Sequence, residues 1–353
     1  MIVVTGFPGF LGRRLVRRLV EEDPEAQVVA LVEPRMLDAA REAAPERVEV
    51  LAADIGERRL GLGDGDWGRL RAEARSVFHL AAIYDLSVPL EIAQRVNVEG
   101  TGHVLELCLE CERLERLNYV STAYVAGVRH GVVYEHELVL GQRFKNHYES
   151  TKFQAEVWVR DAIDRVPTTI YRPAIVVGDS RTGETQKFDG PYFILRVIAF
   201  GVERGWPIPQ FGRSGAPFNV VPVDFVVDAM VAAAGEPAAV GRTLHLVDPE
   251  PVTAAELTRL LAREYAGRGP SYRVPAPLVT ALLRLDGVRK LYGGAPPESI
   301  RYLNHPVRFD TRQAADVLTR SGLRVPRFEE YVAPLVEFFK ANEHDEAFLP
   351  KRL

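Results

Sequence analysis

The sequence predicts an α/β fold, a Rossmann-type doubly wound parallel sheet joined to a smaller, mostly helical C-terminal lobe. In the first half of the chain, short apolar and β-branched runs alternate with amphipathic stretches at helical spacing. These runs are almost continuously apolar, which is typical of parallel strands that are buried on both faces. The length of 353 residues also leaves room for a sheet domain and an added lobe.

Six strands are expected in this first half, at residues 2–5, 28–32, 48–52, 76–80, 116–121 and 168–172. After the first strand, one face of a helix carries the apolar residues Leu11, Leu15, Val16 and Leu19. Two further helices are expected at 96–111 and 148–164, each directly before a strand. Such alternation predicts parallel strands that are connected by helices on both faces of the sheet.

The pattern loosens after Gly178. Residues 179–217 are rich in glycine, proline and aromatic side chains, which predicts a folded excursion over the cleft. A segment at 218–224, a helix through Ala234 and a strand at 243–247 are expected to return to the sheet. From Thr253 onward, short helices separated by proline and glycine predict a second lobe. We therefore assign 1–178, with returning segments at about 218–248, to the Rossmann domain, and 179–217 with 249–353 to a substrate-binding lobe.

The charge balance excludes some classes of partner. The chain has 44 Lys and Arg against 48 Asp and Glu, a formal net charge of −4, which argues against nucleic acid or an anionic membrane. Two cysteines cannot form a disulfide framework. No signal-peptide pattern opens the chain, and no apolar run approaches the roughly 20 residues of a transmembrane helix. We therefore expect a cytoplasmic protein without a transmembrane segment.

A glycine-rich turn with the spacing G-x-x-G-x-x-G follows the first strand and opens the first helix. Gly6 allows a tight turn, Gly9 lets a pyrophosphate approach backbone N–H groups, and Gly12 lets the helix pack closely on the sheet. The helix N terminus offers further unpaired donors to an anion. This turn predicts a dinucleotide site whose contacts are Gly6, Phe7, Pro8, Gly9, Phe10, Leu11 and Gly12.

The ends of the second and third strands are expected to hold the adenosine part of the cofactor. Glu33 can accept hydrogen bonds from the ribose hydroxyls and repel a 2′-phosphate, which favours NAD. Arg35 and Arg13 leave NADP open, and the alternative is that all three are solvated loop charges. Asp54 and Ile55 are placed to face the adenine, although Asp54 is equally well placed to cap a helix.

The segment Tyr148-Glu-Ser-Thr-Lys152 places a phenol and an ammonium on one face of a helix. A phenol has a pKa of about 10, and a nearby cation is expected to lower that pKa toward neutrality. Lys152 can also hydrogen-bond the nicotinamide ribose. The fifth strand ends in Ser121 and Thr122, which supply a hydroxyl to orient a substrate carbonyl. These residues predict acid–base chemistry in which Tyr148 donates a proton.

Taken together, these motifs resemble those of the extended short-chain dehydrogenase/reductases. The matching segments, in the family's order, are Thr5–Gly12, His79-Leu-Ala-Ala82, Asn97-Val-Glu-Gly-Thr101, Ser121-Thr122, Tyr148/Lys152 and Tyr171-Arg-Pro173 with Gly178. Within this family, residues 9–12, 120–127 and 178–184 look most like the fatty acyl-CoA and carrier-thioester reductase (male sterility) branch. That branch implies NADPH, whereas Glu33 favours NAD.

The resemblance also implies roles for individual residues. Thr122 becomes the catalytic hydroxyl, with Ser121 as the one-residue alternative, Tyr148 the general acid, and Lys152 the ribose anchor. It implies further cofactor contacts at Leu80, Ala81, Ala82, Asn97, Ser121, Pro173, Ala174, Ile175 and Val176. Related enzymes are often homodimers, and no metal site is implied.

Aromatic side chains suggest an apolar substrate pocket, and Tyr84, Phe188 and Tyr192 are the candidates to line it; Phe193, Trp206 and Phe211 are weaker ones. The alternative is that these rings are ordinary core. The apolar residues Leu278, Val279, Leu282, Leu285 and Val288 predict an amphipathic helix that packs on the lobe. Cys108 and Cys111 are expected to pack on a helix face rather than bind a metal.

The leading hypothesis is an NAD(P)-dependent oxidoreductase that reduces, or reversibly oxidises, an apolar small molecule such as an acyl thioester, an aldehyde or a ketone. A second hypothesis is a nucleotide-sugar epimerase or dehydratase with tightly bound NAD. A polar, arginine-rich lobe would favour that alternative. A third is a non-catalytic nucleotide sensor, against which the intact Tyr148/Lys152 pair argues.

Overall fold

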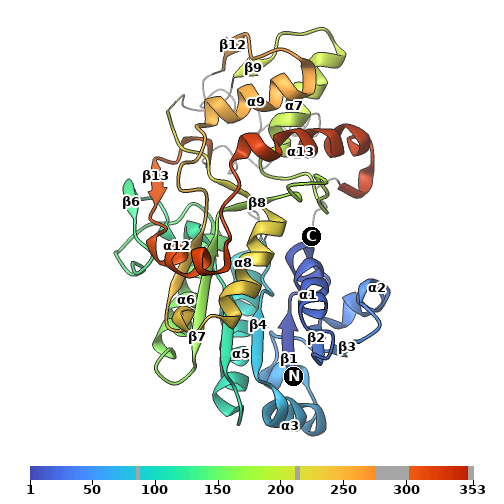
Figure 1. Cartoon of the computed structure of the whole chain (residues 1–353), viewed down its shortest axis with the longest axis vertical. Helices are drawn as coiled ribbons and strands as arrows, with labels where there is room; N and C mark the ends of the chain where they lie inside the picture. The colour runs from blue at the N-terminus through green and yellow to red at the C-terminus, as the bar shows by residue number, and fades with distance from the viewer. Residues whose placement is uncertain (85–87, 211–214, 275–301, 349–353) are drawn as a thin grey trace.

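The computed structural model describes residues 1–84, 88–210, 215–274 and 302–348. Its centre is a seven-stranded sheet in the order β11-β7-β5-β4-β1-β2-β3, in which every pair of neighbours is parallel (Figure 1). The strands are β1 (Ile2–Thr5), β2 (Val28–Val32), β3 (Val48–Ala52), β4 (Ser76–His79), β5 (Arg116–Val120), β7 (Thr168–Pro173) and β11 (Thr243–Leu246). The predicted Rossmann-type sheet is therefore confirmed.

Successive strand residues enter two different cores, one on each face of the sheet. Val4 contributes to the core beneath α1 (Phe10–Glu22), α8 (Val223–Gly235) and α12 (Arg312–Leu318). Val3 contributes to the core beneath α3 (Asp64–Glu73), α5 (Gly100–Glu110) and α6 (His147–Asp161). Helices on both faces explain why every residue of β2, β5 and β7 is buried.

The expected helix at 96–111 differs from the observed one at its start. Helix α4 (Leu90–Ala93) runs into a π-helical segment, η3 (Gln94–Glu99), which continues directly into α5. In the π segment the side chains depart from the periodicity of a continuous α-helix. Such segments often occur near functional sites. A short helix α2 (Leu37–Ala43) connects β2 to β3.

Three pairs of short parallel strands lie outside the central sheet. Strand β8 (Ile175–Val177) pairs with β10 (Val220–Pro222), so the segment expected to return to the sheet at 218–224 joins β8 instead. Helix α8 and strand β11 then do return. The other pairs are β6 (Gly131–Val133) with β13 (Val307–Phe309), and β9 (Pro209–Gln210) with β12 (Tyr272–Arg273).

A second group of helices, at the top of Figure 1, forms the lobe. It contains α7 (Tyr192–Glu203), α9 (Ala254–Ala266) and α13 (Phe328–Asn342). These helices pack around a common core that includes Phe188 and, on α13, Phe339. Val307, Phe309 and α12, in the region assigned to the lobe, pack on the sheet core instead, because β13 pairs with β6. Among the described residues, no helix has the length and apolarity to cross a membrane.

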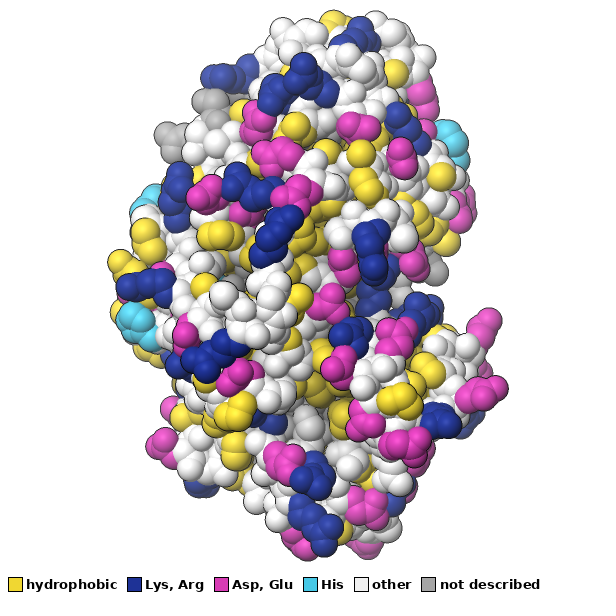
Figure 2. Space-filling model, viewed as in Figure 1, with side chains coloured by type: hydrophobic (Ala, Val, Ile, Leu, Met, Phe, Trp, Pro, Cys, Tyr) yellow, Lys and Arg dark blue, Asp and Glu magenta, His cyan; other side chains and the backbone are white. Residues whose placement is uncertain are grey.

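The face of the molecule that Figure 2 shows is mixed in charge. In the view of Figure 2, basic and acidic side chains are interspersed over both parts, with a notch between the lobe and the sheet domain at the right. The exposed ion pairs are of the ordinary surface kind, such as Arg324 with Glu330. This pattern agrees with the formal net charge of −4.

Candidate active site

The sheet reverses its strand order between β1 and β4, because β2 and β3 lie on one side of β1 and β4, β5, β7 and β11 on the other. Ligands of open α/β sheets bind at such a reversal, beyond the carboxyl ends of the strands. The segment after β1 and the segment after β4 lie in contact at this reversal. A Cβ atom on Gly6 would lie 2.8 Å from the Ala81 nitrogen.

The glycine turn is shaped for close backbone packing. Gly6 has a φ of +89°, which favours glycine. An added Cβ on Gly9 or on Gly12 would lie 2.8 or 2.4 Å from the Gly6 carbonyl oxygen. Helix α1 starts directly after Gly9 with no side-chain cap and no acidic residue in its first turn. Its N–H groups are thus suited to an anionic pyrophosphate.

The side chains between these glycines point in different directions. Phe7 and Pro8 are buried, and Phe7 belongs to the sheet core. Phe10 and Leu11 are partly exposed. Phe7 would therefore contact a cofactor through its backbone alone.

Replacing Gly12 with alanine is expected to weaken dinucleotide binding at least tenfold, because the new methyl group cannot fit against the Gly6 carbonyl without moving the turn. Calorimetric titration with NADH and NADPH measures this loss. Gly201→Ala in α7 is the matched control, since a methyl group there meets no atom within 4 Å. Equal cofactor affinity in the two variants would contradict the assignment of the turn.

A chain of buried hydrogen bonds ties the ends of β1 and β4 to η3 and α5. The Thr101 hydroxyl donates to the Asn97 carbonyl oxygen (2.7 Å) and so accepts from His79 Nε2 (3.0 Å). His79 Nδ1 then accepts from the Thr5 hydroxyl (2.7 Å), which accepts from the Ala81 N–H (3.2 Å). Burial, helped by the charge of Lys152, lowers the pKa of His79 to about 3. The imidazole is neutral and structural.

Asn97 holds the segment after β4 against α6, the helix that carries Tyr148 and Lys152. Its Oδ1 accepts from the Ile83 N–H (2.8 Å), and its Nδ2 donates to Thr151 Oγ1 (3.0 Å). Asn97 is fully buried within η3. The residues Leu80, Ala81 and Ala82 are thereby held, partly exposed, beside the glycine turn.

At the adenosine end, the charged residues pair with one another. Arg35 Nε donates to Glu33 Oε1 (2.5 Å), and both side chains are well exposed. Asp54 does not cap a helix, because its Oδ1 accepts from the Gly56 N–H and its Oδ2 from Arg95. The Ile55 side chain is buried in the sheet core. The Glu33–Arg35 pair leaves the choice between NAD and NADP open.

Of the two hydroxyls after β5, Thr122 is the one beside Tyr148. A hydrogen bond with Thr122 favours the ionised form of the Tyr148 phenol. Thr122 also begins a 3-10 turn, where its Oγ1 accepts from the Tyr124 N–H (3.3 Å). The Ser121 hydroxyl points elsewhere and donates to the buried Glu156 carboxylate (2.6 Å). Ser121 therefore has no side-chain oxygen directed at Tyr148.

Tyr148 and Lys152 lie on consecutive turns of α6, as their spacing predicts, but the electrostatics differ from expectation. Burial raises the pKa of Tyr148, and the bond to Thr122 opposes this rise. Lys152 donates to the Val120 carbonyl oxygen (2.7 Å), and its Nζ lies 4.4 Å from the Tyr119 ring centroid. Burial lowers the pKa of Lys152 to about 7, against the influence of Glu156. A phenol with a raised pKa stays protonated near neutrality.

The three candidate substrate residues separate into two groups. Tyr84 is 49% exposed and packs edge-on against Tyr148, with ring centroids 5.0 Å apart. Phe188 and Tyr192 are 0% and 2% exposed and belong to the lobe core, and their role in lining a substrate pocket stays a prediction. Both rings pack against the Phe339 ring. The Tyr192 hydroxyl accepts a hydrogen bond from the Gly178 N–H (3.1 Å).

The other aromatic and cysteine candidates divide as follows. Phe193 is partly exposed and Trp206 is 51% exposed, while Phe211 and the expected helix at 278–288 lie outside the described residues. Cys108 and Cys111 are free thiols on and directly after α5, and burial raises the pKa of both. Cys108 packs in the core beneath α5, as expected, and Cys111 packs against that core from the end of the helix. The described residues contain no group of three or more His, Cys, Asp or Glu suited to a metal ion.

The segment after β7 lies next to the lobe. Pro173 and Ala174 are buried, and Ile175 and Val176 are partly exposed. A Cβ added to Gly190, just before α7, would lie 3.2 Å from the Ile175 side chain. These residues border the site where the sheet domain and the lobe meet.

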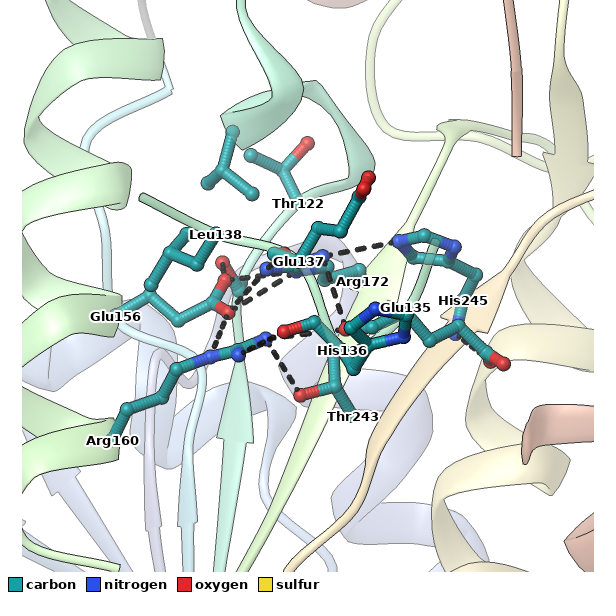
Figure 3. Close-up of polar contacts among 12 residues, drawn as sticks. Thr122, Glu135, His136, Glu137, Leu138, Glu156, Arg160, Arg172, Thr243 and His245 are labelled. Atoms are coloured by element: carbon teal, nitrogen blue, oxygen red, sulfur yellow. Dashed lines mark hydrogen bonds and ion pairs between the residues drawn. The ribbon is translucent and has the colours of Figure 1, made fainter. Parts of the chain in front are cut away.

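A buried charge network behind the site was not predicted from the sequence. Figure 3 shows Arg172 directed at Glu156, with Arg160 reaching the same carboxylate from below. The shortest contact joins Arg172 Nη2 and Glu156 Oε1 (2.6 Å). Burial would raise the pKa of Glu156, but Arg172, Arg160 and the Ser121 hydroxyl hold it below its ordinary value. Alternating charges along 149–160 are the sequence signal that could have indicated it.

A second buried carboxylate in this network lies at the N terminus of α12. Glu135 accepts from the backbone N–H groups of His245 (2.9 Å), Gln313 (2.6 Å) and Ala314 (3.0 Å). Burial raises the pKa of Glu135 to about 7, and these donors oppose the rise. Glu135 therefore fastens the chain after β6 to the C-terminal segment.

The sequence matches a known family over most of the sheet domain. Residues 4–230 fit the model of the NAD-binding male sterility protein family. The chain belongs to this family. The predicted resemblance to the male sterility branch is therefore confirmed, and the NAD-binding family supports a nicotinamide cofactor, with the choice of NAD or NADP undecided.

Several curated proteins are similar to this member of the male sterility family. An aldehyde reductase, lnaA, from Aspergillus flavus is 28% identical over 372 residues, covering 92% of this chain and 34% of that protein. A carboxylic acid reductase from Segniliparus rugosus is 27% identical over 268 residues, covering 65% of this chain and 22% of that protein. The chain thus spans about a third or less of the length of these relatives.

Solved structures show the same fold. The terminal R domain of the myxalamid PKS-NRPS biosynthetic pathway matches with a TM-score of 0.81 and 25% identity, over 98% of this chain and 92% of that one. A UDP-glucuronic acid 4-epimerase from Bacillus cereus, in complex with NAD, matches with a TM-score of 0.67 and 18% identity, over 98% and 99% of the two chains. The latter likeness concerns the fold alone.

Proposed function

We propose that this protein is an NAD(P)-dependent reductase of an apolar carbonyl compound, either an acyl thioester, an aldehyde or a ketone. The observation that carries the proposal is the grouping of Thr122, Tyr148 and Lys152 at the carboxyl end of β5, two strands from β1 and its glycine turn. The names of its relatives, which include an aldehyde reductase and a carboxylic acid reductase, support the same reaction type.

The residues present fit a dinucleotide. The glycine cradle and the uncapped N terminus of α1 would hold the pyrophosphate, Glu33 and Arg35 the adenosine ribose, and Lys152 the nicotinamide ribose. When bound, the reduced cofactor supplies a hydride to the carbonyl carbon.

The chain's own residues supply the proton and the orientation. Tyr148, held protonated by its raised pKa, donates its proton to the carbonyl oxygen as negative charge develops there. Thr122, whose side chain hydrogen-bonds the phenol, would also bond the carbonyl oxygen and so fix the geometry of the transfer. The Lys152 ammonium, close behind on α6, stabilises the phenolate that remains.

A screen of acyl-CoAs, aldehydes and ketones, each with NADH and NADPH in parallel, tests this function. We expect oxidation of the reduced cofactor, followed at 340 nm, with at least one apolar substrate and none with nucleotide sugars. Turnover of nucleotide sugars with no net consumption of cofactor would instead indicate an epimerase. Enzyme that binds dinucleotide and turns over no substrate would indicate a sensor.

Two variants test whether Glu33 and Arg35 determine the preference between NADH and NADPH. Glu33→Gln removes the negative charge of the pair and is expected to shift preference toward NADPH by about tenfold. Arg35→Gln removes the positive charge and is expected to shift it toward NADH. Shifts in the same direction would exclude this pair as the selective element.

A further inference from the structure

Five charged side chains of alternating sign lie along α6 and the short segment just before it. They are Lys145, Glu149, Lys152, Glu156 and Arg160. The first four are buried, which is costly for a charge unless a partner compensates it. Lys152 belongs to the site, and Glu156 pairs with Arg172 and Arg160. The pair Lys145–Glu149 has no part in the mechanism above.

This pair is tightly enclosed. Lys145 Nζ donates to Glu149 Oε1 at 2.8 Å, with side chains 5% and 0% exposed. The Tyr302 hydroxyl donates to the same oxygen (2.7 Å) and accepts from Asn146 Nδ2 (2.9 Å). The ammonium lies 4.9 Å from the Tyr302 ring centroid and 5.4 Å from that of Tyr124. A distant segment of the chain thus seals the pair.

Helix capping accounts for only half of this arrangement. Glu149 Oε2 accepts from the Lys145 N–H (3.0 Å), and Asn146 Oδ1 accepts from the Glu149 N–H (2.9 Å), much as in a capping box. A neutral glutamine would serve that purpose as well. The second oxygen, the buried ammonium and Tyr302 remain unexplained by a cap.

The position of the pair beside the reacting phenol offers a reason. Glu149 follows Tyr148 directly, and its negative charge disfavours the ionised forms of Tyr148, Tyr84 and Tyr302. The titratable and charged groups around Tyr148 are Glu149 and Lys152 on α6, Tyr119 on β5 and Tyr84 after β4. Asp189, Tyr124 and Tyr302 act in turn on Tyr84. Lys145 compensates the charge of Glu149 through a direct ion pair.

We propose that Lys145 and Glu149, sealed by Tyr302, are positioning residues that set the proton affinity of Tyr148. This proposal rests on the proposed function, in which Tyr148 is the proton donor. Because the two charges oppose each other, removing either one changes the field at the phenol in a predictable direction. Removal of Lys145 leaves an uncompensated anion and makes Tyr148 a weaker acid. Removal of the Glu149 charge makes it a stronger acid.

The test is a titration of one phenol by fluorine NMR, with 3,5-difluorotyrosine in place of Tyr148. The fluorinated phenol ionises in a pH range in which proteins stay folded. We expect Lys145→Met to raise the titration midpoint and Glu149→Gln to lower it, each by about one pH unit. The double variant is expected to return close to the wild-type midpoint. Lys340→Met is the matched control, because Lys340 also lies over a tyrosine ring, 5.1 Å from Tyr265, but far along the chain in α13.

Equal midpoints in all variants, or shifts of the same sign in the two single variants, would overturn the proposal. If Lys145→Met fails to fold, Glu149→Gln tests the same claim, because its amide oxygen keeps the cap. Turnover is not needed for this readout, so a failure of the proposed function would show separately, in the wild-type substrate screen. With an active substrate, the pH profile of reduction should move with the NMR midpoint.

Discussion

Replacing Tyr148 with phenylalanine is expected to reduce turnover by about 100-fold to 10,000-fold while leaving cofactor affinity nearly unchanged. The substitution removes only the hydroxyl that gives the proton and keeps the ring that packs edge-on against Tyr84. No other hydroxyl replaces it, since Thr122 is far too weak an acid at neutral pH. The loss should appear in kcat more than in KM, because the proton moves in the transition state.

Steady-state kinetics with the best substrate of the screen, together with calorimetric titration of the cofactor, measure the two effects. Tyr265→Phe is the control, because it removes a tyrosine hydroxyl that bonds Glu343, the residue directly after α13, within the lobe. Full activity of Tyr148→Phe would exclude the mechanism. Loss of cofactor binding together with activity would show that the variant disturbs the site as a whole.

Local sequence patterns predicted the parts of the site that local rules determine. The spacing of Tyr148 and Lys152 places them on consecutive turns whatever the surroundings, and the turn at Gly6 must follow the first strand. The direction of the Tyr148 pKa was not predictable in this way. It depends on how deeply α6 is buried, which is a property of the packed structure.

Aromatic content gave less reliable guidance. The rings of Phe188 and Tyr192 indicate burial, but the sequence does not show whether a buried ring faces a cavity or another ring. In this protein, α13 returns from the end of the chain to cover them, and only Tyr84 stays open beside Tyr148. The π segment around Asn97 was likewise invisible, because its residues carry an ordinary helical pattern.

Arg172→Leu is expected to lower the free energy of unfolding by about 3–5 kcal/mol, because it leaves Glu156 buried without its main partner. Arg172 is 1% exposed and contacts both oxygens of Glu156. It also donates to the carbonyl oxygens of Glu135 (3.4 Å) and Glu137 (2.9 Å), so the variant leaves backbone acceptors unsatisfied as well. Arg160 and Ser121 compensate only part of the carboxylate charge.

Guanidinium unfolding followed by circular dichroism measures the change. Arg324→Leu is the matched control, because Arg324 pairs with Glu330 at the surface, and exposed pairs contribute little to stability. The double variant Arg172→Leu/Glu156→Leu should lose less than the two single variants added together, since the unpaired charge is then absent. Stability of Arg172→Leu equal to that of the control would contradict a structural role for the pair.

The pH dependence gives an independent check on the same pair. The pKa of Glu156 lies below its ordinary value in the folded state, so the pair stabilises the fold above the unfolded carboxylate pKa, 4.5, and this contribution is lost as the pH falls through the folded pKa. In Arg172→Leu the carboxyl can be protonated more readily, which relieves the buried charge. The difference in stability between wild type and variant should therefore be largest near neutrality and should narrow on acidification. A difference that does not change with pH would mean that lost packing around Arg172, and not the charge of Glu156, causes the destabilisation.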